Sequence, residues 1–194
     1  MSNVALNVAK KFNGEPKFEI LGGVQFMSPP PSTPHSDFSG NSFSMMKNHF
    51  KGTKCRVFMK HELFLSDDDW VRPDVMVICD PEKIKYEGVF GAPDLIIEVL
   101  SPSTSKRDRG YKFNLYEKHG VTEYWMADTK NRTITVYMLE TDDGKYFLHN
   151  EYYIPEEHEL KRMSDKEKAE VVYEFKTHLS DDLIVDIREV FENV

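Results

Sequence analysis

The sequence predicts a single α/β domain, and three observations support that fold class. Two apolar runs, VMVIC at 75–79 and LII at 95–97, lack polar alternation and therefore indicate strands covered on both faces. Apolar residues at helical spacing precede and follow these runs, over 35–50 and 105–118. A length of 194 residues is enough to bury one substantial core, so we expect 1–194 to form one domain.

Before the first buried strand, turn residues and apolar patterning define the expected elements. Gly22-Gly23 lies between two short apolar runs, which is typical of a hairpin, and three consecutive prolines make the next connector rigid. In order, we expect a loose polar leader (1–15), hairpin strands (18–21 and 24–27), a proline-rich connector (28–33), a helix (35–50) and an extended stretch (55–65).

After the second buried strand, the pattern predicts one more helix and several strands. Pro102 ends the strand, because a proline cannot continue a central ladder, and Gly120 is a typical stop for the helix that follows. In order, we expect that helix (105–118), two strands (122–127 and 133–139) joined by a turn (128–131), a charged, solvent-exposed insertion that is helical or mobile (156–172), a strand (183–185) and an amphipathic tail (187–191).

The charge balance and the cysteines limit the classes of partner and compartment. A formal net charge of -8 disfavours a nonspecific nucleic-acid binder, but a local basic strip can still contact phosphates, so a nuclease is not excluded. Cys55 and Cys79 lie in apolar runs without metal-type spacing, so we expect buried free thiols rather than a disulfide, and hence a cytoplasmic protein. No apolar stretch is long enough to span a membrane, and no signal-peptide core is present.

Three acidic residues, Asp74, Asp94 and Glu98, belong to the two buried strands, where an uncompensated carboxylate is unfavourable. Asp94 and Glu98 share a strand face, but a rise of about 3.3 Å per residue separates their Cα atoms by about 13 Å, too far to bind one ion directly. If the strands pair as a symmetric antiparallel hairpin, Asp74 lies opposite Glu98 with Cβ atoms about 5 Å apart. In that register Asp94 faces Ile78, where it is expected to cap the strand start or to support the site.

The facing carboxylates predict a divalent cation between Asp74 and Glu98, since two such groups repel each other. Oxygen ligands without a neighbouring His or Cys favour Mg²⁺, or Mn²⁺, over zinc. The simpler interpretations are that Asp74 is a turn residue after Pro73 and that Glu98 has no chemical role. Both alternatives stay open at the level of the sequence.

The helix after the second strand supplies the candidate cations. Asp108 and Lys112 are one helical turn apart, and the simpler interpretation is an exposed ion pair of a few tenths of a kcal/mol. The functional interpretation is that Lys112 reaches over the strand end to hold a phosphate and orient the attacking water. Three basic residues at the helix start suit phosphate binding, or form a solvated face: Lys106, Arg107 and Arg109.

A set of motifs between 17 and 139 carries a resemblance to a known family. The motifs are MSPP at 27–30 with His35, RPDV at 72–75, APDLIIEVLSPS at 92–103, DRGYK at 108–112, Tyr116, Gly120-Val121 and EYWMAD at 123–128. Together they resemble the PD-(D/E)xK nuclease superfamily, and more narrowly its "putative restriction endonuclease" branch, often called the Uma family.

The resemblance implies a restriction-endonuclease-like core, with a central mixed sheet flanked by helices, and a metal-dependent phosphodiesterase site. Asp74 corresponds to the motif aspartate and Glu98 to the acidic residue of the (D/E)xK element, and the carbonyl of Val99 would be a further metal ligand. Leu100 stands where the parent pattern has its lysine. Lys112, on the next helix, is the candidate replacement.

Supporting positions around the metal are assigned to Asp94, Asp108, Glu19 and His35. Glu19 lies in a segment similar to a Tyr-Glu-Leu stretch of the branch that is followed by Asp-Gly, but Gly22 replaces that aspartate and leaves the role of the segment open. His35 could line the site or cap its helix, and we favour the capping interpretation.

The leading functional hypothesis is Mg²⁺-dependent, restriction-like hydrolysis of DNA phosphodiester bonds. The partner is then DNA, and a homodimer is an arrangement that would let the protein cut both strands. The alternative is a nuclease-fold binding or interaction protein with weak or no activity, which the acidic charge and the missing in-strand lysine favour. A weaker option is hydrolysis of a small phosphate ester.

Overall fold

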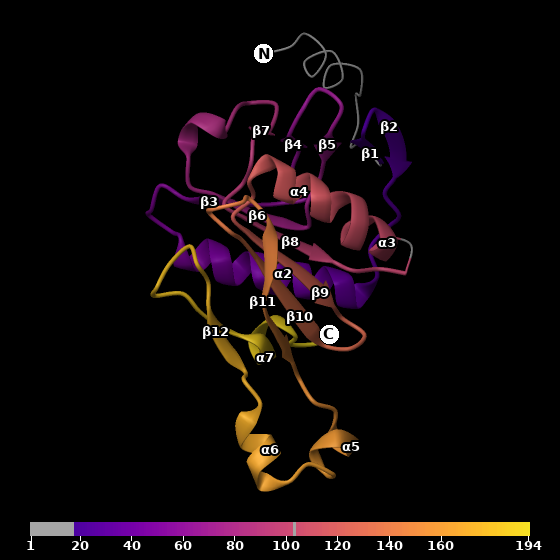
Figure 1. Ribbon diagram of the computed structural model, residues 1–194, viewed down its shortest axis with the longest axis vertical. Helices are drawn as coiled ribbons and strands as arrows, with labels where there is room; N and C mark the ends of the chain where they lie inside the picture. The colour runs from indigo at the N-terminus through magenta and orange to yellow at the C-terminus, as the bar shows by residue number, and fades with distance from the viewer. Residues whose placement is uncertain (1–17, 103) are drawn as a thin grey trace.

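The computed structural model describes residues 18–102 and 104–194, and their strands form three sheets (Figure 1). The expected leader at 1–15 lies outside the described residues. The largest sheet has six strands, in the order β11 (Tyr146–Tyr153), β10 (Thr133–Leu139), β9 (Glu123–Asp128), β8 (Leu95–Val99), β6 (Val75–Ile78) and β3 (Arg56–Met59). Only β8 and β9 pair in parallel in this sheet, so the predicted central mixed sheet is confirmed.

A smaller sheet covers one end of the molecule. Its five strands follow the order β2 (Val24–Met27), β1 (Phe18–Leu21), β5 (Trp70–Val71), β4 (Leu63–Phe64) and β7 (Val89–Phe90). The predicted hairpin is confirmed, because β1 and β2 pair antiparallel around Gly22 and Gly23. Both glycines have φ in the left-handed region, +57° and +75°, which a glycine adopts without a steric penalty.

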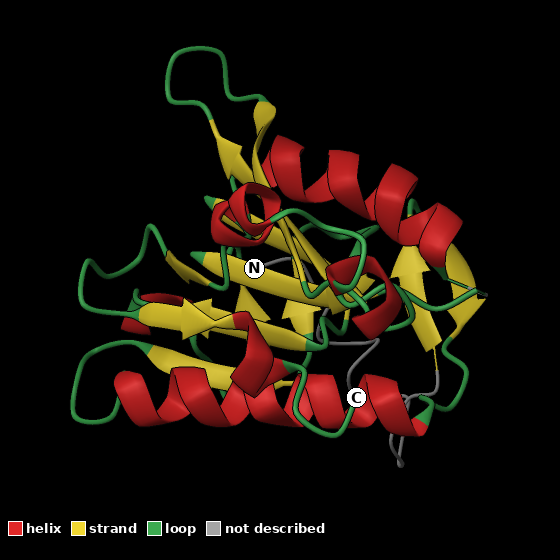
Figure 2. Ribbon diagram, turned by 90° about the horizontal axis from the view of Figure 1, so that it is seen from below, coloured by secondary structure: helices red, strands yellow, loops and turns green. Residues whose placement is uncertain are grey.

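The hydrophobic core packs on both faces of β6 and β8. Every residue of both strands is buried, as their continuous apolar sequence predicts. Helix α2 (Thr33–His49) covers one face through Phe38 and Met46, and α4 (Phe113–His119) covers the other through Leu115 and Tyr116. Figure 2 shows the long helix and the shorter helical stretch on opposite sides of the strands.

The register of β6 and β8 decides which acidic residues meet. Val75 pairs with Ile97 and Val77 with Leu95, which is the predicted antiparallel register. The next pair along the same register is Asp74 and Glu98. Since successive side chains point to opposite faces, Glu98 follows Ile96 onto the face covered by α4.

The helices begin and end at residues typical of helix termini. Ser32 caps α2 and its hydroxyl accepts a hydrogen bond from the His35 backbone N–H at 3.4 Å. The predicted helix at 105–118 is present, but a π-helical turn, η2 (Asp108–Lys112), separates α3 (Ser105–Arg107) from α4. Gly120 ends it in a left-handed conformation. No helix of the described residues is long and apolar enough to cross a membrane.

The carboxyl-terminal part contains the predicted insertion and a small third sheet. Two short, largely exposed helices, α5 (Glu157–Leu160) and α6 (Asp165–Glu170), project at the end of the molecule opposite the β1–β2 hairpin (Figure 1). The remaining elements are η1 (Pro81–Lys83), β12 (Glu174–Lys176), β13 (Ile184–Asp186) and α7 (Ile187–Val190). Strand β11 was not predicted, because most of its residues face solvent at a sheet edge and give no buried apolar pattern.

The two cysteines form a disulfide, Cys55–Cys79, so the prediction of free thiols is wrong. In the β3–β6 register Arg56 faces Ile78, and the flanking positions of the two strands are the two cysteines. Their proximity arises from this long-range strand pairing, which the spacing of cysteines along the sequence does not reveal. The step from free thiols to a reducing compartment therefore loses its basis.

Candidate active site

A cavity of about 510 Å³ lies where the start of β6 meets the end of β8. Its wall also includes parts of the proline-rich connector, the first turn of α2, the residue after β3, the start of the helical stretch after β8 and the end of β9 with the turn that follows it. Its charged and titratable lining residues are Glu19, His35, Lys60, Arg72, Asp74, Glu98, Arg107, Asp108, Lys112, Asp128 and Lys130.

Asp74 is held by contacts to both of its carboxylate oxygens. Oδ2 accepts a hydrogen bond from the Val99 backbone N–H at 2.8 Å. Oδ1 is 2.8 Å from Nε2 of His35 and 3.7 Å from Nζ of Lys60. His35 thus lines the site and contacts Asp74, while Ser32 caps the helix, so the capping role that we favoured for His35 is wrong.

Glu98 is buried, and two side chains of the following helix donate to the same oxygen of its carboxylate. Nζ of Lys112 is 2.9 Å and the Tyr116 hydroxyl 2.7 Å from Oε1. Burial raises the pKa of Glu98 to about 8, although the Lys112 ammonium opposes the rise. Three neighbouring carboxylates add to it: Asp108, Asp74 and Glu19. Burial also raises the pKa of Tyr116, so its hydroxyl remains a neutral donor.

Lys112 is only 4% exposed and lies between three carboxylates. Its Nζ is 2.8 Å from Glu19 Oε1, 2.9 Å from Glu98 Oε1 and 3.8 Å from Asp108 Oδ1. Burial by itself would lower the pKa of Lys112, but these carboxylates outweigh it and raise that pKa above its ordinary range. The simpler prediction of an exposed Asp108–Lys112 ion pair is wrong, because both side chains are buried.

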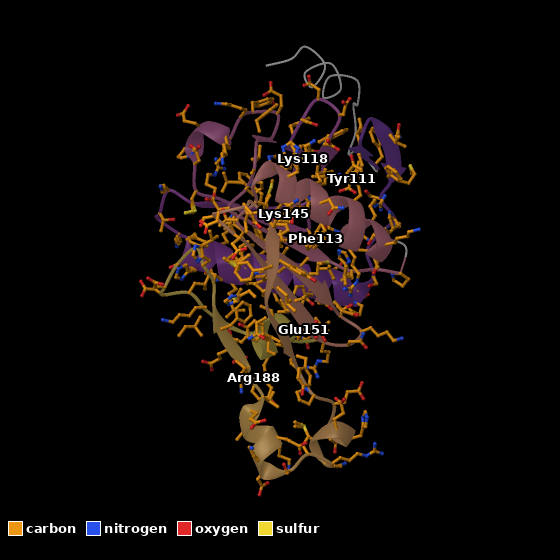
Figure 3. All side chains as sticks on the ribbon, in the orientation of Figure 1. Tyr111, Phe113, Lys118, Lys145, Glu151 and Arg188 are labelled. Carbon is orange, nitrogen blue, oxygen red and sulfur yellow. A yellow bond between two sulfur atoms is a disulfide. The ribbon has the colours of Figure 1, made fainter. Side chains whose placement is uncertain are left out.

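The sequence neighbours of Lys112 anchor its position on the helix. The Tyr111 hydroxyl donates to Asp69 Oδ1 at 3.0 Å, next to the β1–β2 turn. The Phe113 ring packs edge-on against Tyr137, with ring centroids 4.9 Å apart. Figure 3 shows Tyr111 and Phe113 on this helical stretch. Lys112, which lies between Tyr111 and Phe113 in the sequence, is therefore directed at the strand ends.

Other predicted residues lie away from this centre. Asp94 Oδ2 accepts from the Cys79 backbone N–H at 2.6 Å, so Asp94 caps the end of β6 and does not line the cavity. Of the three residues predicted to bind phosphate, only Arg107 lines the cavity, and its guanidinium carbon lies 5.3 Å from the Phe26 ring centroid. Lys106 and Arg109 are exposed outside the lining.

Sequence reasoning missed two side chains of the site. Tyr116 lies four residues after Lys112, so helical spacing could have identified its hydroxyl as a second donor to Glu98. Lys60 follows a different strand, and no local pattern connects it with Asp74. Glu19, which was predicted to support the site, accepts from Lys112 at 2.8 Å and from the Arg72 backbone N–H at 3.0 Å.

The donor atoms at the strand ends suit a hard divalent cation. Asp74, Glu98 and the Val99 carbonyl offer oxygen ligands, and Mg²⁺ commonly takes one or two carboxylates with water and phosphate oxygens. Burial, and after it the neighbouring carboxylates, raise the pKa of Glu98, and a bound cation would favour the ionised carboxylate. Among the described residues, no group of three or more His, Cys, Asp and Glu side chains forms a metal site by itself. Water or a ligand would therefore have to complete the coordination.

Comparisons with known proteins place this geometry in context. A family profile described as "Uma2: Putative restriction endonuclease" matches residues 5–163. A protein of Synechocystis sp., described as uncharacterized, is 30% identical over 161 residues, which are 81% of this chain and 83% of that protein. The crystal structure of "a putative nuclease belonging to DUF820" from Anabaena variabilis has a TM-score of 0.71 and 20% identity, and the match covers 99% of this chain and 98% of that one. At that identity the structural likeness concerns the fold.

Proposed function

Because the chain belongs to the Uma2 family, described as "Putative restriction endonuclease", we propose that it is a metal-dependent endonuclease that hydrolyses DNA phosphodiester bonds. Family membership supports a nuclease-like function. The metal dependence, the DNA substrate and the residue roles are our proposal, which rests on the cavity at the ends of β6 and β8.

One observation carries the proposal. Asp74 and Glu98 face each other one step beyond the Val75–Ile97 pair, and both line one cavity, with a buried lysine against Glu98. Burying two carboxylates costs hydration free energy even when each has a partner, and an apolar pair would fill these positions with less loss. The arrangement therefore supports chemistry rather than packing.

The roles follow from the contacts. Asp74, Glu98 and the Val99 carbonyl would hold Mg²⁺ or Mn²⁺. Once bound, the ion supplies positive charge to the transition state and lowers the pKa of water. Lys112 and Tyr116 donate to one oxygen of Glu98, which orients the carboxylate and leaves its second oxygen for the ion. His35 at Oδ1 and the Val99 backbone N–H at Oδ2 orient the carboxylate of Asp74. Arg107, on the cavity wall, would contact the DNA backbone.

Plasmid nicking tests this proposal. Supercoiled DNA is incubated with the parent protein, Asp74→Ala and Glu98→Ala, each with Mg²⁺, Mn²⁺ or a chelator. We expect nicking by the parent only with metal, and loss of nicking in both variants. Glu151→Ala, an exposed acidic residue on β11, is the control for the change in charge (Figure 3). Nicking that survives both site substitutions would remove Asp74 and Glu98 from the mechanism.

A nuclease-fold binding protein without useful activity is the second candidate. It is favoured by the close engagement of Glu98 with Lys112 and Tyr116, which already satisfies the carboxylate. It is also favoured by Leu100 at the position of the parent lysine. Calorimetric titration with Mn²⁺ separates the two candidates, since a binding protein of this kind would neither nick plasmid nor take up the metal.

A further inference from the structure

Lys60 lies directly beside the carboxylate that we assign to the metal, although it comes from another strand. Met59, the last residue of β3, pairs with Val75, so the next residues outward along the two strands are Lys60 and Asp74. The Lys60 side chain is 38% exposed, lines the cavity and has its Nζ 3.7 Å from Asp74 Oδ1. It is therefore at the rim of the site and open to a ligand.

The backbone at Lys60 adopts a conformation that side chains rarely take. Its φ is +48°, in the left-handed region that favours glycine. The surrounding chain holds it there, because the Lys60 N–H donates to the carbonyls of Pro73 (3.0 Å) and Asp74 (3.2 Å). The Lys60 carbonyl accepts from Arg72 Nη2 at 2.8 Å and Nε at 3.1 Å. Such held conformations are common where a side chain is aimed at a ligand.

The two lysines of the site, Lys60 and Lys112, differ in whether their N–H donors are available to a ligand. Lys112 is buried and within hydrogen-bond distance of Glu19 and Glu98. In the described part of the chain, the only ionic contact of Lys60 is with Asp74, at a distance longer than a hydrogen bond. The ammonium group of Lys60 thus keeps its N–H donors available at the mouth of the cavity.

The charge of the site makes a cation necessary at that place. Four carboxylates line the cavity near the strand ends, those of Glu19, Asp74, Glu98 and Asp108. A bound phosphodiester brings another negative charge. We propose that Lys60 is a catalytic residue that donates a hydrogen bond to a non-bridging oxygen of the scissile DNA phosphate, while Lys112 positions Glu98. This inference rests on the proposed nuclease function.

The left-handed backbone permits a clean test. Lys60→Gly removes the side chain in a conformation that glycine accepts, so the thermal midpoint should not fall. Arg132→Gly is the matched control, because Arg132 also has a left-handed φ, +50°, carries the same charge and does not line the cavity. Lys60→Arg keeps a positive charge at this position. Binding of a fluorescent DNA duplex is measured in chelator over a series of salt concentrations, and plasmid nicking is measured with Mg²⁺.

Loss of one phosphate contact should reduce the slope of log K against log salt concentration by about 0.9 in Lys60→Gly. Nicking should fall by about 100-fold, the effect of losing one donor to the transition-state charge. Lys60→Arg should recover most of both, and Arg132→Gly should match the parent. An unchanged slope with normal nicking in Lys60→Gly, or equal losses in Arg132→Gly, would overturn the inference.

The same experiment distinguishes failure of the inference from failure of the proposed function. If Asp74→Ala abolishes nicking and Lys60→Gly does not reduce it, the nuclease assignment stands and the role of Lys60 falls. If the parent shows metal-independent nicking or none, the nuclease assignment falls, and the salt slope alone decides whether Lys60 contacts DNA phosphate. A parent that does not bind the duplex at any salt concentration contradicts both.

Discussion

A Pro-Asp pair lies near each end of β6, but the two aspartates make different contacts. Asp74 and Asp94 each follow a proline at the start of a buried strand. Asp74 lies in the cavity, with His35 and Lys60 beside its Oδ1. Asp94 lies at the other end of the sheet, where its Oδ2 accepts a hydrogen bond from the Cys79 backbone N–H. A Pro-Asp pair therefore does not by itself mark a site.

The difference arises from antiparallel pairing. Because β6 and β8 run in opposite directions, their starts lie at opposite ends, and only the start of β6 meets the end of β8, where Glu98 lies. The first turn of α2 and the turn after β3 converge on that same end. The other end is closed by the Cys55–Cys79 disulfide. The end that contains Asp74 is the candidate active site, and the other end is held together by a covalent cross-link.

The largest expected effect comes from exchanging each aspartate for asparagine, which keeps its shape. Asp74→Asn should reduce metal-dependent nicking by about 10³-fold, since the loss of a metal ligand removes several kcal/mol of transition-state stabilisation. Asp94→Asn keeps an oxygen that accepts from Cys79 and should leave nicking within a few-fold of the parent. Plasmid assays on both variants measure the contrast, and equal losses would erase the distinction between the two ends.

Removal of Lys112 should have the next largest effect, on stability. Lys112→Ala leaves the buried carboxylates of Glu19, Glu98 and Asp108 without their cation, and breaking a buried pair in this way lowers the free energy of unfolding by about 3 kcal/mol. Urea denaturation at neutral pH gives the value. Lys145→Ala removes an exposed lysine (Figure 3) whose partner Glu117 keeps a hydrogen bond from the Tyr146 backbone N–H, so this control should change the midpoint little. Similar losses in both variants would argue against a buried charge network.

The disulfide end should respond in stability and not in chemistry. The double substitution Cys55→Ala and Cys79→Ala should lower the free energy of unfolding by about 2 kcal/mol, because the unfolded chain is no longer constrained by the cross-link. Nicking by the folded fraction should persist. Loss of nicking in a variant that remains folded would show that the two ends of β6 are coupled.

The free energy of unfolding should also depend on pH. In metal-free protein burial raises the pKa of Glu98 from its ordinary value of 4.5 to about 8, so across this range the folded state binds a proton that the unfolded state releases. The free energy of unfolding should therefore fall as the pH rises from about 4.5 to about 8, by at most about 1.4 kcal/mol per pH unit for this one proton.

Glu98→Gln should remove that part of the pH dependence, and Asp94→Asn should keep it. Denaturant titrations in chelator at several pH values provide the measurement. A Glu98→Gln profile parallel to that of the parent would show that burial and the carboxylates around Glu98 do not shift its titration.

Much of this geometry follows from patterns that are local in the sequence. The hairpin around Gly22, the two strands buried on both faces and the pairing of Asp74 with Glu98 were predictable, because strand periodicity and a symmetric antiparallel connection define them. The helix that carries Lys112 was predictable from its apolar spacing and from Gly120. The π-turn within it was not, since no residue type marks such a turn.

The sequence by itself determined the fold class, the buried strand pair and the facing carboxylates, because continuous apolar runs identify the two strands and a symmetric antiparallel connection defines their register. Only the tertiary structure decided that Cys55 bonds to Cys79, that Glu19 and Lys112 form an ion pair, and that Lys60 stands beside Asp74. These contacts join strands and helices whose mutual placement results from packing of the whole core. Local propensity contains no information about such placement, which is why two identical Pro-Asp starts came to differ.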